Sequence, residues 1–180
     1  MLFIEISTNF KTLLMRNKVF TITDNVLASQ GQRFINGLLD ALFIYILILS
    51  AGTTIILVAE ATHSFAVSSW VETLTVLEII FYGMLVLFLY YFLTEVYFAR
   101  TLAKLVTRTV VVKSDGTKPT IKMIFIRTVA RFIPFEALSY LGSVSRGWHD
   151  AISGTYVVKK RKLAKSIQYF NNPEEFGRVE

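Results

Sequence analysis

The position of the basic residues constrains this chain more than any other feature. From Phe34 to Ala99 there is no Lys or Arg, although the chain contains 19 of them. A few precede this window, and the others follow it, beginning at Arg100. Charge inside the window is only acidic, at Asp40, Glu60, Glu72, Glu78 and Glu95. A soluble surface of this extent would carry basic residues, so the pattern indicates an integral membrane protein.

The composition supports the same class. Apolar residues make up 53% of the chain and charged residues 18%, whereas soluble domains carry about 25% charged residues. This much apolar surface offsets the conformational entropy of the chain, which excludes disorder. With 180 residues, the chain has the size of one domain.

Two stretches of the window are long and apolar enough to cross a bilayer as helices, at about residues 34–59 and 73–99. The acidic loop between them contains Trp70, which suits a membrane interface. Because basic residues flank both outer ends and none lies in the loop, we expect both termini in the cytoplasm. The predicted fold class is an all-α membrane protein. It is a two-span transmembrane helical hairpin with cytoplasmic interfacial or re-entrant helices and a small cytoplasmic strand pair.

The chain divides into three predicted parts. Residues 1–18 place apolar side chains at helical spacing, which predicts an amphipathic helix on the cytoplasmic membrane face or packed on the protein. Residues 19–158 form the membrane domain, and residues 159–180 a basic cytoplasmic tail. Within the domain, residues 119–145 predict interfacial or partly re-entrant helices, because two arginines would be costly in mid-bilayer.

Two short runs inside the membrane domain are rich in strand-forming residues, at 109–112 and 155–158. They lie on either side of the predicted interfacial helices. We expect them to pair and to close a small cap on the cytoplasmic side.

The charged residues near the cytoplasmic ends of the spans are the candidates for function. Asp40 lies inside the first span and shares a helix face with Arg33, which needs a carboxylate partner. Because the spans are antiparallel, Glu95 lies in the same leaflet as Asp40. Two close carboxylates raise at least one pKa, which indicates a proton- or cation-binding site. The candidate residues for ion or ligand binding are Arg33, Asp40, Glu95, Arg100, Arg127, Arg131 and Asp150.

The same residues allow a second interpretation. A structural ion-pair network would pin the cytoplasmic helices to the hairpin and would also perturb pKa values. In such a network we expect Asp150 to contact Arg33, Arg127 or Arg131. Both interpretations stay open from the residues alone.

Several other chemistries are excluded or poorly supported. The chain has no Cys and two His, which argues against disulfides, thiolate zinc sites and a His-rich metal site. Ser145 and His149 are not part of a GxSxG motif, so we expect no enzymatic activity. No phosphate-binding loop or dinucleotide motif is present, and no cofactor is expected.

The net charge of +6 would suggest nucleic acid in a soluble protein. Beside a membrane, basic residues favour anionic lipid instead, and no nucleic-acid partner is expected. The residues expected to contact lipid are Lys159, Lys160, Arg161 and Lys162.

Four segments together resemble a known family. Residues 33–40 read Arg-Phe-Ile-Asn-Gly-Leu-Leu-Asp, and residues 146–158 contain Asp150 in Arg-Gly-Trp-His-Asp-Ala-Ile-Ser-Gly-Thr-Tyr-Val-Val. Between them lie Glu-Val-Tyr-Phe-Ala-Arg-Thr-Leu-Ala-Lys at 95–104 and Arg-Phe-Ile-Pro-Phe-Glu at 131–136. In order and spacing they resemble the RDD family of bacterial membrane proteins, named for one arginine and two aspartates. The resemblance covers roughly residues 19–158.

The resemblance implies a bacterial inner-membrane protein, and transport has been proposed for the family. Ala99 and Ala103 stand where the family usually has glycine, and we expect alanine to extend the helix there. Two helices cannot enclose a water-filled path, so a transporter would be a homo-oligomer or a subunit of a membrane protein complex. The alternative function is a non-catalytic scaffold or assembly subunit of a larger inner-membrane complex.

Overall fold

The computed structural model describes residues 19–134 and 146–172. The amphipathic helix predicted at residues 1–18 lies outside the described residues. So do residues 135–145 of the predicted interfacial segment and residues 173–180 of the basic tail.

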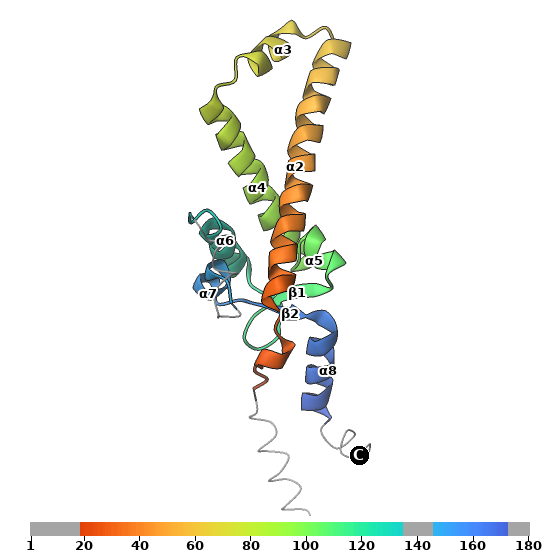
Figure 1. Cartoon of the computed structure of the whole chain (residues 1–180), viewed down its shortest axis with the longest axis vertical. Helices are drawn as coiled ribbons and strands as arrows, with labels where there is room; N and C mark the ends of the chain where they lie inside the picture. Colours follow the sequence, from red (N-terminus) through yellow and green to blue (C-terminus); the bar gives the residue numbers. More distant parts are fainter. Residues whose placement is uncertain (1–18, 135–145, 173–180) are drawn as a thin grey trace, which may run out of the picture.

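Two long helices, α2 (Gln30–Ala61) and α4 (Val76–Phe98), form a hairpin (Figure 1). Both are long and apolar enough to cross a membrane. The 32 residues of α2 measure about 48 Å at 1.5 Å per residue, which exceeds a hydrocarbon core of about 30 Å. The predicted loop between the spans contains a further short helix, α3 (Phe65–Glu72), which joins the far ends of the hairpin (Figure 1).

Both long helices begin with a capping box. Ser29 accepts a hydrogen bond from the backbone N–H of Gln32, whose side chain accepts one from the Ser29 N–H in return. Thr75 and Glu78 repeat this arrangement at α4, where Glu78 Oε2 lies 2.8 Å from the Thr75 nitrogen. Glu78, the acid inside the second predicted span, therefore caps the first turn of α4. A carboxylate at this position also interacts favourably with the helix dipole.

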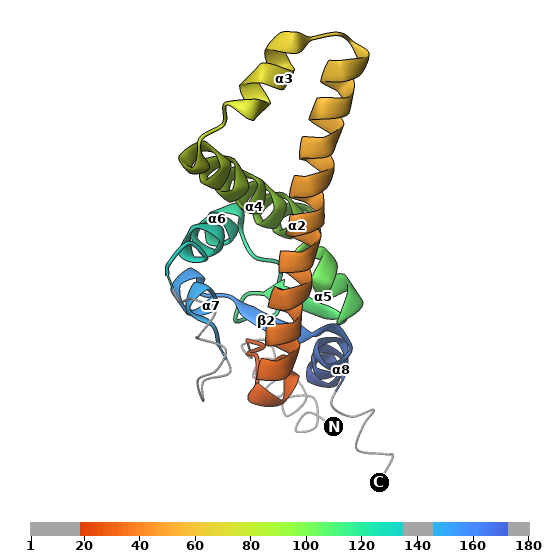
Figure 2. The same ribbon diagram turned by 45° about the horizontal axis from the view of Figure 1, so that its top comes forward.

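The two long helices contact each other near one end only. Ile44 of α2 packs there with Tyr90 and Tyr91 of α4, and the helices diverge toward α3 (Figures 1 and 2). Within the most apolar windows, 6% of α2 and 11% of α4 is buried. Apolar surface of this extent needs lipid around it, so the chain is a membrane protein.

The elements after α4 form a compact region that we call the cap. Its two strands, β1 and β2, are antiparallel, with Val111 opposite Val157. The predicted strand pair is therefore present, with β2 one residue later than expected. The cap comprises α5 (Leu102–Val106), β1 (Thr109–Val112), α6 (Ile121–Ala130), α7 (Trp148–Ser153), β2 (Tyr156–Lys159) and α8 (Lys160–Asn171).

The sheet has a small apolar core on one side. Val26 lies in the short 3₁₀ helix η1 (Asp24–Val26), just before α2, and it packs with Val112, Val158 and Leu163 of α8. The backbone N–H of Ala28 also donates to the carbonyl of Val157 at 2.9 Å. The segment that enters the hairpin is thus tied to the sheet, and the start of α2 is fixed relative to the cap.

The expectation that Ala99 extends the second span is wrong. Helix α4 ends at Phe98, and Ala99 adopts the left-handed conformation with φ 53°. This conformation costs an L-residue other than glycine about 1–2 kcal/mol. That cost explains why the family that this segment resembles usually has glycine at this position. The Ala99 carbonyl accepts from the Val111 N–H at 2.9 Å, which ties the turn to β1. The reversal directs Thr101 and α5 back toward the hairpin.

Helix α6 packs beside α4. Phe125 makes edge-on contacts with Phe88 and Phe92, at 6.0 and 6.3 Å between ring centroids. Ile121 and Val129 of α6 are exposed apolar residues. The interfacial position of this helix stays a prediction.

Candidate functional site

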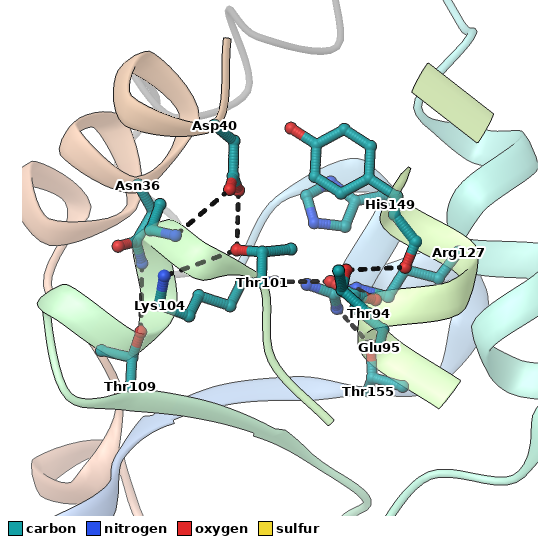
Figure 3. Close-up of polar contacts among 12 residues, drawn as sticks. Asn36, Asp40, Thr94, Glu95, Thr101, Lys104, Thr109, Arg127, His149 and Thr155 are labelled. Atoms are coloured by element: carbon teal, nitrogen blue, oxygen red, sulfur yellow. Dashed lines mark hydrogen bonds and ion pairs between the residues drawn. The ribbon is translucent and has the colours of Figure 1, made fainter. Parts of the chain in front are cut away.

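Seven charged side chains meet where the hairpin contacts the cap, and we call them the charge cluster. Figure 3 shows four of them, Asp40, Glu95, Lys104 and Arg127. Its three carboxylates, on Asp40, Glu95 and Asp150, are 2%, 0% and 0% exposed. Burying ions is costly unless they are paired and hydrogen-bonded, so the partners of each decide what the cluster can do. The cluster consists of Arg33, Asp40, Glu95, Lys104, Arg127, Arg131 and Asp150.

Asp40 of α2 is held by neutral donors. Its carboxylate accepts from the Tyr90 hydroxyl at 2.7 Å. It also accepts from the Thr101 hydroxyl at 2.8 Å (Figure 3). The backbone N–H of Ala103 donates to it at 3.4 Å. Thr101 is also the N-cap of α5, where its hydroxyl accepts from the Lys104 N–H. Asp40 thereby joins both spans to the start of α5.

Glu95 of α4 is surrounded by cations. Lys104 Nζ lies 2.5 Å from Oε1, and Arg127 Nε lies 2.8 Å from Oε2. Arg131 Nη2 adds a longer contact of 3.4 Å, and its guanidinium stacks on the Tyr91 ring at 3.9 Å. One buried carboxylate therefore connects the second span to α5 and to the end of α6.

Asp150 of α7 forms salt bridges with Arg33 of α2 and Arg127 of α6. It also accepts from the Thr155 hydroxyl at 3.3 Å, and Arg127 donates to that hydroxyl at 2.7 Å. Arg127 is 0% exposed and bridges Asp150 to Glu95. It is the central cation of the cluster, because it joins the two most buried carboxylates.

Neutral polar residues line the same region. Asn36 donates from Nδ2 to the Thr109 hydroxyl at 3.1 Å and accepts from the Thr107 hydroxyl at 2.5 Å. His149 is buried beside Asp150, with Nε2 3.4 Å from its carboxylate. Burial and the surrounding cations hold the pKa of His149 well below its usual value of 6.5, which keeps the ring neutral.

The structure brings together six of the seven residues predicted from the sequence. The exception is Arg100, which forms no salt bridge in the described part of the chain. Asp150 contacts two of its three expected partners, Arg33 and Arg127. Arg33 was expected to pair with Asp40, but its salt bridge is with Asp150, whereas Asp40 is held by hydroxyl and amide donors.

Sequence reasoning missed Lys104. The residue lies in the motif at 95–104, nine positions after Glu95, but it resembles any basic residue that follows a span. In the structure it is 3% exposed and pairs with Glu95. Burial lowers the pKa of Lys104 from 10.5 to about 7; Glu95 opposes this shift, and Arg127 and Arg131 add to it.

The residues predicted to contact lipid lie at the end of β2 and in the first turn of α8. Lys160, Arg161 and Lys162 are exposed, and Lys159 is half-buried. Lys162 also donates to the Asn25 carbonyl at 3.0 Å. Contact with lipid stays a prediction.

A small cavity lies within the charge cluster. Its volume is about 20 Å³, which is room for one water molecule. The residues lining it come from the cap end of α2 and from the cap, and every cluster member except Glu95 contributes. The lining residues are Arg33, Asn36, Gly37, Asp40, Lys104, Arg127, Arg131, His149, Asp150 and Val157.

Comparison with known protein families gives a match over most of the chain. The family model of the RDD family matches residues 27–164, which include both spans and the cap as far as the first half of α8. The chain belongs to the RDD family. Neither the curated proteins nor the solved structures contain a match to it.

Membership in the RDD family confirms the resemblance seen in the sequence. The arginine and two aspartates of the resembling motifs are Arg33, Asp40 and Asp150 in this chain. In this RDD protein they join the hairpin to the cap through two separate sets of contacts. Arg33 and Asp150 link α2 to α7, while Asp40 links α2 to α4 and α5.

Proposed function

We propose that this RDD protein is a non-catalytic membrane transport subunit that handles a small ion at the charge cluster. The observation that supports this best is the cavity of about 20 Å³ lined by charged side chains of the cap end of α2 and of the cap. Charged groups in such a position are expensive and commonly mark ion pathways. The size of the cavity favours a single small ion over a larger polar solute.

The proposed transport requires more than one chain. Helices α2 and α4 diverge away from the cap, and the far half of the hairpin is lined by apolar residues (Figure 1). One chain therefore forms no polar path across a membrane within its described residues. We propose a homo-oligomer or a complex with other membrane proteins, in which neighbouring chains complete the path.

We propose that the protein lies in the bacterial inner membrane with the cap and both termini in the cytoplasm. The asymmetry of Lys and Arg supports this orientation, since none of the 19 lies between Phe34 and Ala99. Anionic lipid headgroups would then neutralise exposed basic residues of α8 such as Lys160 and Arg161.

A non-catalytic scaffold is the second candidate. It is favoured by the partners of the three carboxylates, because Asp40, Glu95 and Asp150 all contact donors from other elements of the chain. In this function the cluster would serve only to lock the cap onto the hairpin. The cap and the exposed hairpin would then hold other proteins together.

A measurement of ion flux distinguishes the transport function from the scaffold function. The purified protein would be reconstituted into vesicles of phosphatidylethanolamine and phosphatidylglycerol that contain a pH-sensitive dye. Gradients of sodium gluconate and of choline chloride would then be imposed in turn, so that a cation and an anion are tested separately. We expect one gradient to produce a protein-dependent pH change that Lys104→Met abolishes and the exposed-site control Lys122→Met retains. Folded protein that produces no change with either salt would overturn transport and favour the scaffold.

A further inference from the structure

A large apolar cavity lies between the two spans, at the end of the hairpin away from the cap. Its volume is about 460 Å³. Helices α2 and α4 form two of its walls, and residues from the end of α3 and the turn after it contribute to the lining. The two helices diverge toward α3, which joins their far ends (Figure 1). The cavity therefore occupies the space that this divergence creates.

Two aromatic residues of the lining indicate how deep the cavity lies in the membrane. Trp70 of α3 and Tyr82 of α4 contact each other edge-on, at 5.9 Å between ring centroids. Tryptophan and tyrosine are enriched where a membrane meets water. The lining continues past them toward the cap, to Ile48 of α2 and Val86 of α4. This deeper part lies among lipid chains, where an apolar cavity stays dry and gains contacts only when hydrocarbon fills it.

The size of the cavity distinguishes a lipid chain from a helix of a second protein. On each span the lining covers seven residue steps, from Ile48 to Ile55 and from Ile79 to Val86, which is about 10 Å along the helix. A helix about 10 Å across would occupy about 800 Å³ over this length, well above the volume of the cavity. At about 30 Å³ for a group of the size of water, the cavity instead has room for about fifteen such groups. This number matches the methylenes of one acyl chain.

The charges at the far end of the hairpin favour a headgroup that carries a cation. Glu60 lies in the last turn of α2, and Glu72 is the last residue of α3; both are exposed. Glu78 adds a third carboxylate in the first turn of α4. No Lys or Arg lies between Phe34 and Ala99. Carboxylates repel an anionic headgroup and attract an ammonium group.

We propose that the cavity binds one phospholipid with an ethanolamine headgroup. One acyl chain lies between Gly52 of α2 and Gly83 of α4, which both line the cavity, and the ammonium group lies near Glu60 and Glu72. The lipid then supplies the packing that the two helices lack where they diverge. The site lies at the opposite end of the hairpin from the charge cluster, so the proposal does not depend on ion handling.

The test is native mass spectrometry of the full-length protein in detergent, with dioleoyl phosphatidylethanolamine and dioleoyl phosphatidylglycerol titrated separately. We expect one ethanolamine lipid to be retained per chain and to raise Tm, because a ligand of the folded state stabilises it. The glycerol lipid has the same acyl chains and should bind about fivefold more weakly, the effect of one charge near a membrane surface. Retention of neither lipid would overturn the proposal.

The two glycines allow the cavity to be filled without a change of charge. An added Cβ at Gly52 or Gly83 meets no atom of the chain within 4 Å, so a leucine side chain has room there. Leucine also favours helix, and we expect Gly52→Leu and Gly83→Leu to fold. Each should lose the retained lipid and the rise in Tm that this lipid causes. Retention of the lipid by both variants would overturn the site.

Gly31→Leu is the matched control for these two variants. Gly31 lies in α2 and has the same open space around its Cβ position, but it does not line the cavity. The control should retain the ethanolamine lipid as the parent does. Loss of the lipid from the control as well would show a general effect of leucine in the spans and would overturn the site.

A charge variant tests the headgroup. Glu60→Gln combined with Glu72→Gln should still retain one lipid, because the cavity is unchanged, but it should lose most of the preference for ethanolamine over glycerol. An unchanged preference would overturn the headgroup contacts. A second copy of the chain is the competing occupant. A dimer without bound lipid that Gly52→Leu dissociates would overturn the proposal in favour of that copy.

Discussion

The cap end and the far end of the hairpin differ in how their helices are held. At the cap end, α2 and α4 contact each other, and Asp40 and Glu95 connect them to α5 and α6. At the far end the helices are apart, and an open apolar cavity of about 460 Å³ lies between them below α3. Polar contacts within the chain thus fix one end, whereas the other end depends on lipid or on a neighbouring chain.

This difference follows from where each force is effective. Apolar packing between helices gains little from the hydrophobic effect inside a bilayer, because lipid is as apolar as leucine. Separating the two partners of a buried ion pair, in contrast, costs much free energy, since each partner left alone is an uncompensated charge. A chain with two spans can therefore hold its geometry through a cluster at one end and leave the other end open.

The largest expected effect is at Arg127, whose loss removes a partner from both Glu95 and Asp150. Arg127→Met should lower the free energy of unfolding by about 3–5 kcal/mol, because it leaves buried carboxylates short of a cation. Thermal and denaturant unfolding in one detergent would measure it, with the exposed Lys122→Met as the matched control on the same helix. A loss no greater than that of the control would contradict a fold held at this end.

A smaller loss is expected at Asp40, which accepts from two hydroxyls and one backbone N–H. Asp40→Asn keeps the shape but turns an amide NH₂ toward those donors. We expect a cost of about 1–3 kcal/mol, the usual penalty for an unsatisfied buried polar group. The free energies of unfolding of Asp40→Asn and Arg127→Met, measured in the same detergent, rank the two losses of stability. If Asp40→Asn were the more damaging, the hydroxyl network rather than the ion pairs would hold the cap end.

The smallest effect is expected at the far end, at Gly52 of α2. An added Cβ there meets no atom of this chain within 4 Å. Gly52→Ala should raise stability by about 0.5–1 kcal/mol, because alanine restricts the unfolded chain and favours helix. The oligomeric state and Tm would be measured together. A marked loss of Tm would show that another chain packs closely against this face in the detergent-solubilised protein.

The sequence predicts the parts of this structure that have simple periodic or charge signals. The spans follow from the absence of Lys and Arg between Phe34 and Ala99, and the strand pair from two runs of β-branched residues. Asp150 joins Arg33 and Arg127 as expected, because a buried carboxylate in a basic cap has few other partners. The sidedness of the cap stays a prediction.

The features that the sequence does not reveal depend on a single turn. Alanine normally continues a helix, yet Ala99 takes a left-handed conformation, and this reversal places Thr101 and Lys104 against the hairpin. Two of the donors to Asp40, Thr101 and Ala103, therefore come from beyond the turn. The third, Tyr90, comes from α4, and Arg33 on the same helix face as Asp40 pairs elsewhere. The burial of Lys104 also depends on this tertiary arrangement, since basic residues after a span commonly face water or lipid headgroups.

The pH dependence of folding tests most directly the account's central claim, that ionisable groups buried in the charge cluster, Lys104 among them, hold the cap end of the hairpin. Its pKa in the fold is about 7, below the ordinary 10.5, so the unfolded chain binds more protons between these values. Stability should therefore rise with pH from about 7 toward 10, by at most about 1.4 kcal/mol per pH unit, and stay level below 7. The measurement is the free energy of unfolding of the parent and of Lys104→Met across this range, in gluconate salts. The account predicts a rise in the parent that Lys104→Met lacks. The same rise in both proteins would contradict it.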